Sequence, residues 1–248
     1  MPPVATPSKP KTRAARSVAA PERSPRAGAA TRTAALTLSS KNYSSWSLRG
    51  WLMGRFAGLA FKEVMVGPDD ADARQEILLL SPSIRVPCLT HDGIKVWDTL
   101  AIGEYLAEVV SGSGLLPADL AARAHCRAIC GEMHSGFSSL RSALPMNLKG
   151  DFPGYKVWTR AIGDIERITA IWGECIEKYG GPYLFGAQRC MADAMYAPVV
   201  TRFRTYHVKL DRTSLVYCDR IMQMPEMQEW AAAARLEPDE IDELDMDF

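Results

Sequence analysis

Two adjacent serines at the start of a predicted helix are the side chains best placed to stabilise an anion. Ser44 and Ser45 follow a turn-forming cluster and precede residues 46–57, whose apolar side chains recur at helical spacing. Unpaired backbone N–H groups and the helix dipole both favour negative charge at such a terminus. A hydroxyl there can cap the helix or hold a thiolate, and the residues alone leave both roles open.

A second helix start, at Asp98 and Thr99, has the same character, because its N–H groups and a hydroxyl would face any anion placed there. Between the two helix starts, Val86-Pro87 opens a predicted strand. A cis proline would expose the backbone N–H and C=O of Val86 to an extended peptide, whereas a trans proline would only begin the strand. The residues alone favour the trans isomer, because only about 5–6% of X-Pro bonds are cis.

The elements that position these residues follow the order β-α-β-α-β-β-α. They are expected at residues 36–40, 46–57, 61–66, 72–80, 86–90, 94–97 and from 98 onward. Asp92-Gly93 predicts a tight hairpin between the last two strands. Beyond Pro117 the pattern predicts helices only, at residues 118–141, 157–179, 191–206 and a final stretch to about 234. The chain therefore combines an α+β layer with an all-helical part.

Several segments, in order and spacing, resemble the cytosolic glutathione transferase superfamily over about residues 35–236. Residues 44–49 are similar to the Ser-Ser-x-Ser-x-Arg helix start of the zeta class, with Trp46 where that class has cysteine. With Asn42 and Tyr43 they also match a bacterial branch that reads Asn-Tyr-Ser-Ser-Trp-Ser-Leu-Arg. Residues 86–89 resemble Val-Pro-x-Leu, whose proline is cis, and residues 98–106 resemble Glu-Ser-x-Ala-Ile-x-x-Tyr-Leu. Residues 183–194 resemble the family's sixth-helix signature.

The resemblance implies an α+β thioredoxin-like N-terminal domain, residues 35–112, followed by an all-α helical-bundle C-terminal domain, residues 118–236. The first would bind glutathione and the second would receive another substrate. Residues 1–34 carry seven basic groups and one acid, and their composition predicts a disordered extension. With a disordered extension the protein would be cytoplasmic. The alternative is that this segment is an organellar transit peptide. Residues 237–248 carry seven acids and no base, which predicts a solvated tail.

The resemblance also implies roles for individual residues. Ser44 would be the hydroxyl that activates the glutathione thiol, with Ser45 as the second candidate and Tyr43 as the third, since other classes use tyrosine. Val86, ahead of Pro87, would pair with the cysteinyl part of glutathione.

The two ends of the tripeptide have their own expected partners. Asp98 and Thr99 would hold the γ-glutamyl end, and Arg85 would pair with the glycyl carboxylate. His134 and Arg141 fall on a helix expected to face the first domain, where together with Tyr43 they would line the second-substrate site. A structural role for His134 and Arg141 remains the alternative.

Three functions are compatible with these features. The first is a glutathione transferase, with glutathione as co-substrate, that attacks small hydrophobic electrophiles. The second is a glutathione-dependent cis–trans isomerase of the maleylacetoacetate type, suggested by the serine pair, with Arg141 as the candidate basic group at the second site. The third is a non-catalytic scaffold with the same fold. The resemblance implies a homodimer in each case.

Composition excludes several other classes of protein. The 248 residues are 47% hydrophobic and 23% charged, with a formal net charge of zero, so nothing points to a nucleic-acid partner. No run approaches the roughly 20 apolar residues of a membrane span. The six cysteines lack a Cys-x-x-Cys pair, which predicts buried reduced thiols rather than a disulfide framework or a metal site.

One departure from the family pattern bears on stability. Cys190 stands three residues before Asp193, where the family has serine or threonine as a helix cap. Sulfur is a weak hydrogen-bond acceptor, so a poorer cap is expected. Asp193 is expected to be structural rather than catalytic.

Overall fold

A four-stranded mixed sheet begins the fold. The computed structural model describes residues 33–66 and 86–238, which belong to one compact unit. The strands are β1 (Ala34–Leu38), β2 (Lys62–Met65), β3 (Cys88–His91) and β4 (Ile94–Trp97). Their spatial order is β2-β1-β3-β4, with β1 parallel to β2 and antiparallel to β3, and β3 antiparallel to β4. The four strands predicted along the chain and the Asp92-Gly93 hairpin are confirmed.

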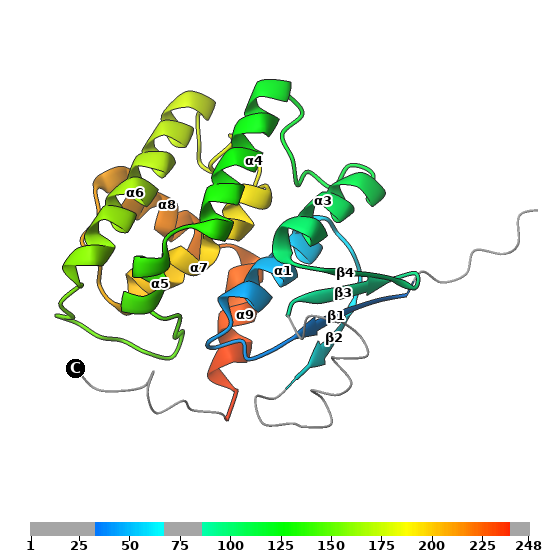
Figure 1. Ribbon diagram of the computed structural model, residues 1–248, viewed down its shortest axis with the longest axis horizontal. Coiled ribbons are helices and arrows are strands. Elements are labelled where there is room, and N and C mark those ends of the chain that lie inside the picture. The colour runs from blue at the N-terminus through cyan, green and yellow to red at the C-terminus, as the bar shows by residue number, and fades with distance from the viewer. Residues whose placement is uncertain (1–32, 67–85, 239–248) are drawn as a thin grey trace, which may run out of the picture. The chain divides into compact units, whose positions relative to one another are not determined.

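Two helices follow strands of this sheet. They are α1 (Ser45–Phe56) and α3 (Thr99–Val109), and α1 also packs against a helix of the C-terminal part (Figure 1). Leu36 and Leu38 of β1 and Leu48 and Leu52 of α1 are fully buried in a common core. The expected helix at 72–80 lies outside the described residues.

The C-terminal part is helical. Its helices are α4 (Leu120–Ser135), α5 (Ser138–Ala143), α6 (Thr159–Tyr179), α7 (Met191–Thr205), α8 (Arg212–Met222) and α9 (Pro225–Arg235). A thioredoxin-like sheet region followed by a helical region is the fold class expected from the sequence, and it is confirmed. The division into domains at residues 112 and 118 remains a prediction.

A single helix over residues 118–141 is a wrong prediction. The chain breaks between α4 and α5, where Phe137 has a φ of 61°, in the left-handed region. At Gly136, which ends α4, a Cβ atom would lie 2.7 Å from the carbonyl oxygen of Glu132. The apolar pattern continues through the break, so the periodicity does not reveal it.

Helix α7 is the most deeply buried helix of the C-terminal part, and it packs against both α1 and α4. Its start contains Cys190 as the N-cap and Asp193, which is fully buried. The Asp193 carboxylate accepts hydrogen bonds from the N–H of Cys190 at 2.8 Å, the N–H of Leu184 at 3.1 Å and the hydroxyl of Tyr217 at 3.1 Å. The carboxylate thus ties three segments together, as its expected structural role requires.

All six cysteines are buried and free, which confirms the expected burial. No helix in the described ranges has the length and apolar character needed to cross a membrane. Within the same ranges, no three His, Cys, Asp or Glu side chains gather as metal ligands.

The expectation that residue 237 begins a solvated tail does not hold for its side chain. The Glu237 carboxylate accepts three hydrogen bonds from the turn at residues 40–42. Residues 239–248 lie outside the described part of the chain, as do residues 1–32.

Candidate active site

A pocket of about 330 Å³ lies where three segments of the N-terminal part meet α4. It is lined by Trp46, Val86, Pro87, Asp98, Thr99 and His134. Five of these six are residues that the sequence predicts for the site, and only Trp46 is new. The pocket therefore brings together both expected glutathione-binding segments and one expected second-substrate residue.

The Val86–Pro87 peptide bond is cis, as the resemblance implies. Pro87 is buried against α1 at Gly50, where a Cβ atom would lie 2.5 Å from the Pro87 Cγ. Only glycine allows this close approach of the proline ring. Gly50 of α1 thereby allows the loop that presents Val86 to the pocket to pack closely on the helix.

The N-terminus of α3 supplies the opposite wall. Asp98 has a φ of 76°, which is a strained conformation for a residue with a side chain. Its Oδ1 accepts hydrogen bonds from the N–H groups of Leu100 at 2.8 Å and Ala101 at 3.4 Å. Thr99 is 1% exposed, and its buried hydroxyl has no hydrogen-bond partner among the described residues. A buried hydroxyl without a partner costs about 1–3 kcal/mol, so this oxygen is poised for a ligand.

His134 connects α4 to the same wall. Its Nε2 lies 2.5 Å from Asp98 Oδ2, and its ring lies 5.3 Å from the Trp46 ring, centroid to centroid. Asp98 therefore uses one carboxylate oxygen for the helix and the other for the imidazole. This contact with Asp98 fixes the His134 ring in the wall of the pocket, where α4 meets the start of α3.

Trp46 forms the pocket wall in front of two arginines. The guanidinium carbons of Arg49 and Arg141 lie 4.6 Å and 4.8 Å from its ring centroid. Arg49 is fully buried, and its side chain donates to the carbonyl oxygens of Met195 at 2.8 Å and Ser45 at 3.3 Å. Burial, and then the charges of Arg141 and Arg202, lower the pKa of Arg49 well below its ordinary value.

Arg141 does not line the pocket. It is partly buried behind Trp46 and donates to the backbone carbonyl oxygens of Met133 and Gly136, near the end of α4. Burial lowers its pKa, and the charge of Asp164 opposes that shift. Arg141 thus contacts the pocket only through the tryptophan ring, and its second-substrate role remains a prediction.

The serine pair lies at the start of α1, outside the described lining of the pocket. Ser44 is the N-cap, and its Oγ accepts the N–H of Ser47 at 3.2 Å and donates to the Ser47 Oγ at 2.9 Å. Ser45 is 7% exposed, and its hydroxyl makes no hydrogen bond within the described part of the chain. Tyr43 is half-buried in the preceding turn, and Arg85 lies outside the described residues.

Sequence reasoning misses the pocket role of Trp46 and the burial of Arg49. Trp46 follows the serine pair directly, and an aromatic residue in the first turn beside an anion site is the one available signal. Arg49 belongs to the Ser-Ser-x-Ser-x-Arg segment, but its burial depends on α7, which is almost 150 residues away.

Comparison with known proteins agrees with this geometry. Residues 43–109 match the model of the glutathione S-transferase N-terminal domain family. Maleylacetoacetate isomerase from Rattus norvegicus is 31% identical over 140 residues, which are 55% of this chain and 62% of the rat protein. The alignment thus spans less than two thirds of that relative's length.

Solved structures extend the match to the helical part. Maleylacetoacetate isomerase from Anaeromyxobacter dehalogenans, with bound GSH in the active site, is 25% identical with a TM-score of 0.58, covering 84% of this chain and 98% of that one. A glutathione transferase homologue from Burkholderia, with bound glutathione, is 24% identical with a TM-score of 0.62, covering 82% of this chain and 98% of that one.

A thioredoxin-like sheet with a cis-proline loop at a pocket, followed by a helical region, has the concave geometry typical of a small-molecule site. Residues 43–109 therefore carry a glutathione S-transferase N-terminal domain, and the described chain has the fold of the solved glutathione transferases.

Proposed function

We propose that the protein is a glutathione transferase that binds glutathione in the pocket of Trp46, Val86 and Thr99 and activates its thiol for attack on a small hydrophobic electrophile. The observation that carries this proposal is the Thr99 hydroxyl, which is buried without a partner at the N-terminus of α3. Together with the positive end of the α3 dipole, it suits the α-carboxylate of a γ-glutamyl group.

The rest of the pocket fits an extended peptide. Val86, next to the cis proline, offers its backbone N–H and C=O to the cysteinyl unit, which would place the thiol toward the start of α1. The Asp98 carboxylate can accept from the α-amino group while it caps α3. Arg85 remains the proposed partner of the glycyl carboxylate.

Glutathione supplies the thiol, and the protein must favour its anionic form. A free thiol has a pKa near 8.5, and lowering it by about one unit requires roughly 1.4 kcal/mol of preferential anion stabilisation. The Ser45 hydroxyl is uncommitted in the described structure, whereas Ser44 donates to Ser47. Ser44 can serve only if the thiolate displaces that contact, so the two serines are distinguishable by experiment.

The test measures the absorbance of bound thiolate and the turnover of an aryl halide with glutathione. The variant that lacks the activating hydroxyl, Ser44→Ala or Ser45→Ala, is expected to lose about 10- to 100-fold in kcat/KM while it retains glutathione binding. Ser142→Ala on α5 is the matched control, because Ser142 is exposed and bonds only within its own helix. Glutathione binding without thiolate would indicate a non-catalytic module, and no binding would refute the proposal.

A second candidate is glutathione-dependent isomerisation of a dicarboxylate. Arg49 and Arg141 place two positive charges behind the Trp46 ring, and these would attract a carboxylate substrate. The names of the rat and Anaeromyxobacter relatives favour the same reaction. Turnover of maleylacetoacetate that exceeds turnover of aryl halides, and that falls in Arg141→Met, would establish this candidate over the first.

We propose a homodimer in the cytoplasm. The edge strand β4 exposes Ile94 and Trp97, which are 52% and 41% accessible and lie on opposite faces of the strand, and a second copy packed along this edge would cover both. Six buried free thiols suit a reducing compartment.

A further inference from the structure

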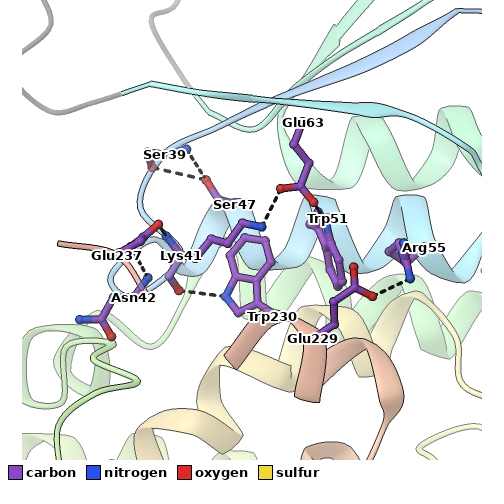
Figure 2. A network of polar contacts seen from close by, with 10 residues as sticks. All are labelled: Ser39, Lys41, Asn42, Ser47, Trp51, Arg55, Glu63, Glu229, Trp230 and Glu237. Atoms are coloured by element: carbon purple, nitrogen blue, oxygen red, sulfur yellow. Dashed lines mark hydrogen bonds and ion pairs between the residues drawn. The ribbon is translucent and has the colours of Figure 1, made fainter. Parts of the chain in front are cut away.

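The carboxylate of Glu237 lies on the turn that leads into α1. Glu237 follows α9, almost 200 residues along the chain from that turn. Its Oε1 accepts the N–H of Lys41 at 2.6 Å, and its Oε2 accepts the N–H of Asn42 at 3.0 Å and the hydroxyl of Ser40 at 2.7 Å. Figure 2 shows Glu237 beside Lys41 and Asn42. Hydrogen bonds to a charged acceptor are stronger than those between neutral groups, so this is a firm attachment.

The turn transmits this attachment to the serine pair. The Ser40 hydroxyl oxygen also accepts the N–H groups of Asn42 and Tyr43, both at 3.1 Å. The carbonyl oxygen of Ser40 accepts the N–H of Ser44 at 3.0 Å. The position of Ser44, the first serine of the pair, is therefore linked to Glu237 through a single residue.

Two further hydrogen bonds support this attachment: one joins α9 to the turn, and the other holds the backbone of Glu237. The Trp230 Nε1 of α9 donates to the carbonyl oxygen of Lys41 at 2.9 Å, and its ring packs 5.2 Å from the Trp51 ring (Figure 2). The Lys149 ammonium donates to the Glu237 backbone carbonyl at 2.5 Å.

The one charged side chain of the turn at residues 40–43, that of Lys41, pairs with Glu63 at 2.6 Å. The Glu237 carboxylate is thus directed to the turn's own N–H groups and hydroxyl.

We propose that Glu237 is a positioning residue for thiol activation: by holding the turn at residues 40–43, it sets where the Ser44 and Ser45 hydroxyls lie at the start of α1. The inference rests on the proposed function. A neutral amide in place of the carboxylate has only one acceptor atom for three donors, and its NH₂ group would face at least one of them. The turn would then lose its fixed geometry while the glutathione contacts at Val86 and Thr99 remain.

The experiment uses the full-length protein and follows the absorbance of bound glutathione thiolate against pH. In Glu237→Gln the apparent pKa of the bound thiol is expected to rise by about 0.5–1 unit, and kcat/KM at neutral pH to fall about three- to tenfold, with glutathione affinity little changed. Glu237→Asp keeps the charge and is expected to restore part of the thiolate signal.

The matched control is Glu229→Gln, which removes another acidic side chain that joins α9 to α1. Glu229 pairs with Arg55 at 2.7 Å and does not touch the turn (Figure 2), so the thiol pKa should stay at its wild-type value. If the thiol pKa in Glu237→Gln equals the wild-type value, the role of Glu237 is refuted and the proposed function is not. The same holds if the thiol pKa shifts equally in Glu229→Gln. Absence of bound thiolate in the wild-type protein overturns the proposed function and the role of Glu237 with it.

Discussion

At the start of α3 a threonine hydroxyl is buried without a hydrogen-bond partner in the described part of the chain, and this predicts opposite effects on stability and binding. Thr99→Val removes the unsatisfied oxygen and keeps the shape, so the free energy of unfolding of the ligand-free protein should rise by about 1 kcal/mol. The same variant should weaken glutathione binding about tenfold or more, because a hydrogen bond to a carboxylate is lost.

Chemical denaturation and calorimetric titration with glutathione measure the two quantities. Thr99→Ser keeps the hydroxyl and should recover most of the affinity. A Thr99→Val protein that binds glutathione as tightly as wild type would show that this oxygen does not face the ligand.

At the scale of residues, short motifs predict most of the pocket. Val86, Asp98 and Thr99 lie where the sequence places them, because each acts through its own backbone or the first turn of its own helix. Arg49 and Glu237 acquire their roles only through segments far along the chain, which local pattern cannot show. The commitment of the Ser44 hydroxyl to Ser47 likewise depends on side-chain orientation rather than on spacing.

Among the helices, the break between α4 and α5 gives a prediction with a built-in control. Gly136→Ala would place a Cβ atom 2.7 Å from the Glu132 carbonyl oxygen, and the unfolding free energy should fall by about 1–3 kcal/mol. Gly131→Ala, one turn earlier in α4, meets nothing within 4 Å and should raise it by about 0.5–1 kcal/mol. Thermal or urea unfolding of the two variants should therefore differ in sign, and equal effects would contradict the steric explanation.

The start of α7 predicts a dependence of stability on pH. Burial raises the pKa of Asp193 to about 6, although hydrogen bonds from Cys190, Leu184 and Tyr217 oppose the shift. Between pH 4 and 6 the folded protein holds a proton on this carboxyl that the unfolded chain has released. Its contribution to stability is therefore present below about pH 4 and falls as the pH rises through 6.

Asp193→Asn removes that titration, together with part of the cap. Over this interval wild type should lose on the order of 3 kcal/mol of unfolding free energy relative to the variant, although the variant is less stable overall. Urea unfolding of both proteins at several pH values measures the difference, and a constant difference from pH 4 to 7 would refute the assignment to Asp193.

Element types are predictable here because apolar spacing is strong in each segment. The strands of the hairpin and the helices α1, α6 and α7 begin and end within about two residues of their expected bounds, and α3 begins one residue after its expected start. The exception is the region around Gly136, where side chains on both sides of the break continue to face the core. Helix continuity there is decided by backbone geometry at Phe137, for which a phenylalanine gives no signal.

On the scale of the whole molecule, the sheet and the helical bundle depend on each other. Helix α1 packs on α7, and the end of α9 holds the turn before α1, so residues at the two ends of the described chain meet beside the serine pair. The order of elements predicts both parts, but the contact between them depends on long-range pairs such as Trp230 with Lys41. Such pairs become visible only in the folded structure.

The exposed edge of the sheet predicts how copies of the chain associate. If Ile94 and Trp97 on β4 contact a second copy, the wild-type protein should sediment at close to twice 27.3 kDa. The double variant Ile94→Glu/Trp97→Glu should sediment as a monomer, because charged side chains would be buried at the interface. Val216→Glu on α8, where Val216 is 59% exposed, changes an equally accessible apolar side chain and should remain dimeric. Analytical ultracentrifugation distinguishes these outcomes. A monomeric wild-type protein would refute the dimer, and dissociation by Val216→Glu alone would place the interface at α8 instead of β4.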